Sequence, residues 1–176
     1  MKKQILIISI LLHALLLMVV YVFQGMIFPF MRLNGLVPLL LPVASTGVAL
    51  YEGRDTGGIT GLFAGILCDI SFNQPAGVFT VLLTMTGLII GTLSDSIILS
   101  GFVTYYISCA AVLIIAAFVQ MFPLMLIPDY NISLFSLIQV AIQQTTYTLI
   151  LAFPIWFFVR ALGKRAERVA PSGKMY

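Results

Sequence analysis

The chain has 176 residues, of which 61% are apolar and only 9% are charged, and its formal net charge is +3. Ordinary soluble domains carry roughly 25% charged residues, so this composition excludes an ordinary soluble protein and indicates a polytopic membrane protein. The positive charges gather at the two ends of the chain, which does not indicate nucleic-acid binding, and we expect no nucleic-acid partner.

A helical membrane span needs about 20 apolar residues, so about six spans would occupy most of the chain. Backbone groups inside lipid must be paired within helices or within a closed barrel, and the continuous apolar runs favour helices. We therefore expect an all-α protein with about six transmembrane helices in one bundle. Residues 1–160 are predicted to form a single transmembrane helical domain, and residues 161–176 a basic cytoplasmic tail.

The first apolar run, residues 4–23, follows Lys2 and Lys3 and is longer than the core of a typical signal peptide. No cleavage site of small residues comes after it, so we expect an uncleaved first span. His13 lies within this span. A neutral imidazole that bonds to a neighbouring helix is the simpler interpretation, and a proton-relay or ligand residue is the alternative.

The second apolar run, residues 36–51, contains Pro38 and Pro42. A proline removes a backbone donor and kinks or breaks a helix. In a membrane, such a break persists only where protein or a cavity covers it. We therefore expect this span to be irregular and packed inside the bundle.

The third and fourth runs, residues 56–72 and 76–93, share one phrase. Residues 61–69 and 87–95 match at five of nine positions, and each copy holds two glycines four apart with an aspartate one turn later. In lipid, such glycines open a groove that lets a neighbouring helix approach closely. The match is either an inverted repeat or a chance result of the composition. The candidate residues for contact with a partner or another helix are Glu52, Gly57, Gly61, Gly65, Asp69, Gly87, Gly91 and Asp95.

The fifth run, residues 100–126, is interrupted by Pro123, and the sixth run, residues 133–159, concentrates polar side chains. Gln139, Gln143 and Tyr147 recur every four residues and therefore share one helix face. This face predicts hydrogen bonds between helices or, as the alternative, a cavity lined for a substrate.

Basic residues set the expected orientation. With six spans and both termini in the cytoplasm, eight Lys and Arg residues fall on the cytoplasmic side and only Arg32 falls outside, as the positive-inside rule requires. We expect the basic tail to attract anionic lipid. Its positive residues are Arg160, Lys164, Arg165, Arg168 and Lys174.

The groups that an enzyme needs do not converge in this sequence. A single histidine excludes a two-histidine metal site, and neither a Gly-x-Ser-x-Gly elbow nor a phosphate-binding loop occurs. Cys68 and Cys109 lie in apolar runs without metal spacing. We therefore expect a non-catalytic binding or scaffolding subunit with no catalytic residue, no metal and no cofactor.

The order of short motifs across the second to fourth runs is similar to that of a known family. Glu52-Gly53, then Gly57-Gly58, the phrase 61–69 and Pro75-Ala76-Gly77 resemble the rod shape-determining protein MreD family, over about residues 36–95. The positions that match the family are Glu52, Gly61, Gly65 and Asp69. The second glycine pair and Asp95 are not clearly part of the family pattern.

The resemblance implies a multi-pass subunit in the bacterial inner (cytoplasmic) membrane that belongs to the cell-elongation complex, which directs peptidoglycan synthesis and rod shape. Such a subunit is non-catalytic and scaffolds its partners, and its glycine-lined groove would receive a partner's helix. It implies a direct partner, an MreC-like single-span membrane protein, and indirect links to MreB, RodA and a class B penicillin-binding protein.

The alternative function is the substrate-binding component of an energy-coupling-factor vitamin transporter, a small six-helix protein similar in fold to the MreD family. These components commonly carry a small-xxx-small motif in the first helix. The first span here pairs Ser9 with His13 and Ala14 with Met18, so it lacks that motif. The glutamine-rich sixth run favours the alternative.

Overall fold

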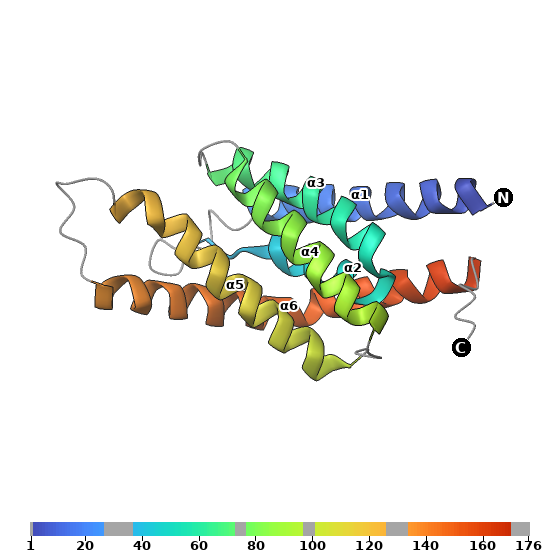
Figure 1. Cartoon of the computed structure of the whole chain (residues 1–176). Helices are drawn as coiled ribbons and strands as arrows, with labels where there is room; N and C mark the ends of the chain where they lie inside the picture. The colour runs from blue at the N-terminus through green and yellow to red at the C-terminus, as the bar shows by residue number, and fades with distance from the viewer. Residues whose placement is uncertain (1, 27–36, 73–76, 97–100, 126–133, 170–176) are drawn as a thin grey trace.

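The computed structural model describes residues 2–26, 37–72, 77–96, 101–125 and 134–169 (Figure 1). Side chains are described for residues 11–26, 37–71, 77–94, 101–120, 135 and 138–160. Within these ranges the chain forms six α-helices and no β-strand, which confirms the all-α class. The helices are α1 (Lys2–Met26), α2 (Leu40–Glu52), α3 (Arg54–Phe72), α4 (Val78–Ser96), α5 (Phe102–Met125) and α6 (Leu134–Val169).

The helices follow the six apolar runs, with two differences. Helix α5 continues past Pro123 to Met125, whereas the sequence predicts an interruption there. Helix α6 includes Pro154 and continues to Val169, beyond the boundary expected at residue 160. Residues 161–169 include Ala, Leu, Lys, Arg and Glu, whose high helix propensity favours continuation of the helix.

Helix α2 forms the centre of the bundle and contacts each of the other helices. Every residue from 40 to 50 is buried, which confirms the expectation that this segment packs inside the bundle. Pro42 stands in the first helical turn, where its missing N–H is one of the groups that a helix leaves unpaired in any case. The helix therefore starts at Leu40, four residues after the apolar run begins, and it is short. It is regular, whereas the sequence predicts an irregular span.

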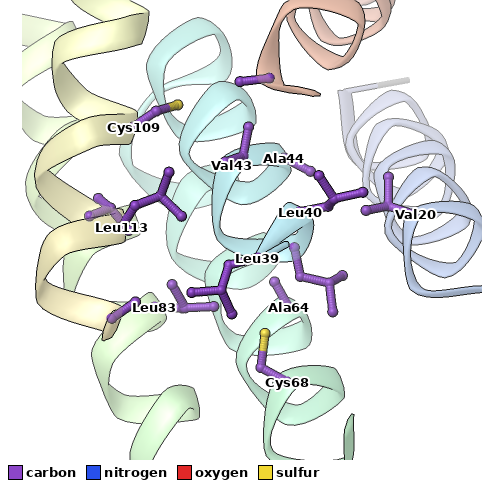
Figure 2. Close-up of a cluster of buried hydrophobic side chains, with 14 of the residues drawn as sticks. Val20, Leu39, Leu40, Val43, Ala44, Ala64, Cys68, Leu83, Cys109 and Leu113 are labelled. Atoms are coloured by element: carbon purple, nitrogen blue, oxygen red, sulfur yellow. The ribbon is translucent and has the colours of Figure 1, made fainter. Parts of the chain in front are cut away.

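The apolar core surrounds α2 on several sides (Figure 2). Leu40 of α2 lies toward Val20 of α1, and Leu113 of α5 lies on the opposite side of α2. Leu83 of α4 and Ala64 of α3 close the cluster from below in that view. The core is thus built around α2, and the other helices enclose it.

The outward faces of the enclosing helices are apolar. Exposed large apolar side chains occur on α1, α3, α4, α5 and α6, for example Leu15 at 62%, Ile107 at 65% and Ile150 at 68% exposure. Extensive exposed apolar surface marks contact with a membrane or with other proteins. Within the part of the chain that the structure describes, two segments are long and apolar enough to cross a membrane, namely Phe102–Gln120 and Ile138–Arg160.

Candidate functional site

The glycines of α3 lie directly against the backbone of α4. A Cβ atom added to Gly61 would stand 2.9 Å from the carbonyl carbon of Leu83. One added to Gly65 would stand 2.8 Å from the backbone nitrogen of Thr80. These separations are shorter than real Cβ contacts, so only glycine allows the two helices to lie this close.

The glycines of α4 make the matching contacts on α3. A Cβ atom at Gly87 would stand 2.9 Å from the carbonyl carbon of Gly57, and one at Gly91 would stand 2.7 Å from the backbone nitrogen of Arg54. Adding 26 to each α3 residue number and subtracting 26 from each α4 residue number turns Gly61–Leu83 into Gly87–Gly57. The same shift turns Gly65–Thr80 into Gly91–Arg54. The repeated phrase therefore places glycines at positions related by a local two-fold axis across the α3–α4 crossing.

The glycine groove is occupied by this chain itself. Gly57 faces both Gly87 on α4 and Ala49 on α2, where an added Cβ would stand 2.7 Å from the Cβ of Ala49. Of the two expected neighbours, a partner's helix or another helix of this chain, the described residues place α4 and α2 in the groove. The physical cause is that both helices of the hairpin carry glycines on the face that meets the other.

Asp69 caps helix α4 from the end of α3. Its Oδ1 atom accepts a hydrogen bond from the backbone N–H of Phe79 at 2.9 Å, and its Oδ2 atom accepts from Gly77 at 3.0 Å and Thr80 at 3.1 Å. The Thr80 hydroxyl donates a fourth bond to Oδ2 at 2.6 Å. A carboxylate at a helix N-terminus pairs free N–H groups and interacts favourably with the helix dipole. Asp69 thus locks the α3–α4 turn, in which Gly77 has a positive φ of 100°.

Asp95 belongs to the helical backbone of α4, but its side chain lies outside the described residues.

Glu52 ends α2 and faces α1. Its Oε1 atom lies 3.1 Å from Nε2 of His13, and the two side chains are only 10% and 1% exposed. His13 thus contacts a residue of a neighbouring helix, as both interpretations of the sequence allow. Gly53 follows with a φ of 85° and starts the turn into α3, a conformation that favours glycine. The Glu52-Gly53 pair therefore fixes α1, α2 and α3 relative to one another.

Polar side chains from α1 and α6 complete the start of α2. The Oε1 atom of Gln24 accepts hydrogen bonds from the backbone N–H groups of Leu40 and Leu41, at 3.1 and 3.3 Å. The Thr148 hydroxyl accepts one from Leu39 at 3.2 Å. The first N–H groups of a helix have no partner within the helix, and burying them unpaired is costly. Sequence reasoning did not identify Gln24 or Thr148, although a glutamine near the end of an apolar run is itself a signal.

The polar residues of α6 divide between two faces. Gln144 is buried, and its Nε2 atom donates to the carbonyl oxygen of Val37 at 3.0 Å and to Oε1 of Gln120 at 3.3 Å. Gln144 therefore joins α6 to α5 and to the segment that precedes α2. Gln139 and Gln143 are exposed on the outer face, whereas Tyr147 packs against the core.

An aromatic group joins α2, α5 and α6 at the end where α2 stops. Nε1 of Trp156 donates to the hydroxyl of Tyr51 at 2.8 Å. The ring of Trp156 meets Phe102 edge-on, at 5.1 Å between centroids, and the guanidinium of Arg160 lies 4.9 Å from its centroid. Tryptophan and tyrosine with a basic neighbour are typical of the boundary between a membrane and water.

The arrangement as a whole holds helices together. Among the described residues, no group of three or more His, Cys, Asp or Glu side chains could hold a metal ion. Cys68 and Cys109 are both free thiols buried in the core. The polar contacts described above either cap a helix, join two helices or close a turn.

Comparison with known proteins identifies no relative. No protein-family model, curated protein or solved structure matches the chain.

Proposed function

We propose that this protein is a non-catalytic membrane subunit of the bacterial cell-elongation complex, of the MreD type. In this role it scaffolds the proteins that direct peptidoglycan synthesis. Its direct partner is an MreC-like single-span membrane protein, through which it is linked to MreB, RodA and a class B penicillin-binding protein.

The observation that carries the proposal is the shared role of the four residues that match the family. Glu52 joins α2 to α1 through His13, and Asp69 caps α4 from the end of α3. Gly61 and Gly65 allow the close crossing of α3 and α4. All four set the positions of helices, as expected of a rigid protein that presents its surfaces to partners. Under this proposal, partners bind the outer surfaces of the helix bundle rather than the glycine groove.

The proposed location is the bacterial inner membrane, with six spans and both termini in the cytoplasm. Figure 1 supports a common side for the termini, because the start of α1 and the end of α6 lie at the same end of the bundle. Lys2 and Lys3 begin α1, Arg54 begins α3, and Trp156, four residues before Arg160, contacts Tyr51 just before the start of α3, which agrees with the positive-inside rule. The basic residues after Arg160 supply the site for anionic lipid.

Two experiments in the native host test the function. Depletion of the protein should turn rod-shaped cells round, and purification in a mild detergent should recover an MreC-like single-span protein. In depleted cells, the variant Glu52→Ala should restore rod shape less well and recover less of the MreC-like protein, because it removes the partner of His13. Asp55→Ala changes an exposed acid nearby and serves as the matched control. Normal rod shape after depletion, with loss of vitamin uptake and recovery of ATPase subunits, would overturn the proposal in favour of the transporter component.

The topology has its own test. A phosphatase that is active only in the periplasm, fused after Tyr176, should be inactive, and a fluorescent protein at the same position should be bright. An active phosphatase fusion would overturn the proposed orientation.

A further inference from the structure

The aromatic group at the end of α2 holds an arginine at the point where a candidate membrane span ends. Arg160 is the last residue of the segment Ile138–Arg160, which is long and apolar enough to cross a membrane. Its guanidinium carbon lies 4.9 Å from the centroid of the Trp156 ring. That ring is fixed in turn by its hydrogen bond to Tyr51 and its edge-on contact with Phe102. The fold therefore positions the cation before any ligand binds.

The charge of Arg160 is not balanced within the part of the chain that the structure describes. Its side chain is exposed, and no carboxylate of a described residue lies within ion-pair distance of it. Along α6, no acidic residue stands three or four positions before or after Arg160, where a helix would place an ion-pair partner. A cation–π contact leaves the guanidinium N–H groups free to donate hydrogen bonds. Arg160 is therefore an oriented cation that can bind an anion.

We propose that the guanidinium of Arg160 and the hydroxyl of Tyr51 bind the phosphate of an anionic phospholipid in the cytoplasmic leaflet. Under the proposed membrane placement, on which this inference rests, the site extends lipid binding from the basic tail to the bundle itself. The Tyr51 hydroxyl accepts the indole N–H at 2.8 Å and has no other partner among the described residues, so its own proton is available to donate. A planar guanidinium binds two phosphate oxygens at once. Trp156 thus carries one donor at the edge of its ring and another over its face.

The surroundings of the site favour a lipid as the source of the phosphate. Headgroup phosphates lie at the boundary where a span ends, at the level where tryptophan and tyrosine gather. Phe153 and Phe157, one turn before and one residue after Trp156, are 59% and 68% exposed and offer apolar contact to acyl chains, which a soluble phosphate lacks. The helix continues from Arg160 into Lys164 and Arg165, and this excess of positive charge favours a lipid of net negative charge over a zwitterionic one.

Quenching of tryptophan fluorescence by brominated lipids tests the site. Trp156 is the only tryptophan of the chain, so the signal of the purified full chain in vesicles comes from this position alone. Brominated phosphatidylglycerol, in a background of phosphatidylcholine, should quench it several-fold more than brominated phosphatidylcholine at the same mole fraction. Arg160→Gln should bring this ratio close to one, and Tyr51→Phe should lower it part of the way. Arg54→Gln removes an exposed positive charge at the start of α3 and should leave the ratio unchanged.

Equal quenching by the two lipids in the unsubstituted protein would overturn the proposal, as would a preference that survives Arg160→Gln. An equal loss of preference in Arg160→Gln and Arg54→Gln would show that overall charge, and not this site, attracts the lipid. A ratio unchanged in Tyr51→Phe would overturn the role of the hydroxyl.

The same measurement separates a lipid phosphate from a soluble one. Inorganic phosphate, added at constant ionic strength, should leave the ratio unchanged, and a ratio that falls to one on its addition would assign the site to a free anion and overturn the lipid proposal. Because only this protein and lipid are present, the experiment does not depend on the elongation partners. A lipid preference together with normal rod shape after depletion would reject the proposed function and leave the lipid site standing.

Discussion

Nε2 of His13 on α1 lies 3.1 Å from Oε1 of Glu52 at the last residue of α2. A carboxylate at a helix C-terminus is unfavourable for the dipole of its own helix, so a donor from another helix offsets this effect. The pair joins residues 39 positions apart and ties the buried α2 to the outer α1.

Removal of the Glu52 carboxylate should loosen α1. Leaving a buried polar group without its partner costs about 1–3 kcal/mol, so Glu52→Ala should lower the midpoint of thermal unfolding in detergent. Glu52→Gln keeps an acceptor for His13 and should lose much less. Asp55→Ala, at an exposed position in the first turn of α3, should lower the midpoint much less, because an exposed carboxylate near a helix start contributes only about 0.3–1 kcal/mol. Equal midpoints for Glu52→Ala and Asp55→Ala would show that the pair contributes nothing.

A methyl group at the crossing of α3 and α4 should force the helices apart. Forcing extra atoms into a well-packed interior costs about 1–3 kcal/mol, and we expect this loss for both Gly61→Ala and Gly87→Ala. Similar losses are expected because the two glycines occupy equivalent positions about the local two-fold axis. Gly25→Ala is the control, since an added Cβ there meets no atom within 4 Å. Alanine has a higher helix propensity than glycine, so Gly25→Ala should keep or slightly raise the midpoint of thermal unfolding. An equal loss in Gly25→Ala and Gly61→Ala would show that crowding at the crossing is not the cause.

Replacement of Asp69 should fray the start of α4. Loss of a helix N-cap costs about 0.5–2 kcal/mol, and Asp69→Ala should reach the upper part of that range because four donors lose their acceptor. Asp69→Asn keeps one acceptor oxygen and should preserve most of the stability and function. Faster amide hydrogen exchange at Phe79 and Thr80 would be the direct readout. Loss of function in Asp69→Asn with normal exchange would instead indicate a role in proton transfer.

Loss of the Gln24 amide should expose the start of α2. Leaving buried donors unpaired costs about 1–3 kcal/mol, so Gln24→Leu should destabilise the fold even though it adds apolar surface. Amide exchange at Leu40 and Leu41 should accelerate first. Gln139→Leu makes the same glutamine-to-leucine change at an exposed position and should leave the exchange at Leu40 and Leu41 unaltered. Identical exchange in the two variants would contradict the capping role of Gln24.

The sequence by itself determined the helical class, the approximate position of each helix and the burial of α2. Continuous apolar runs dictate helices, and two prolines at the start of the second run place it where other protein must surround it. The four-residue spacing of Gly57, Gly61 and Gly65 also identified one close-packing face correctly. These features depend on neighbours within a few positions along the chain, so local pattern is enough to recognise them.

Only the tertiary structure decided which element meets each of these features. A glycine face shows that some helix can approach closely, but α4 of the same chain fills it, because its own glycines stand in register after the turn at Gly77. In the same way, Asp69 meets the start of α4 and Gln24 meets the start of α2. Such partners are separated along the chain and are brought together by burial of the core, and a pattern of residue types does not encode that choice.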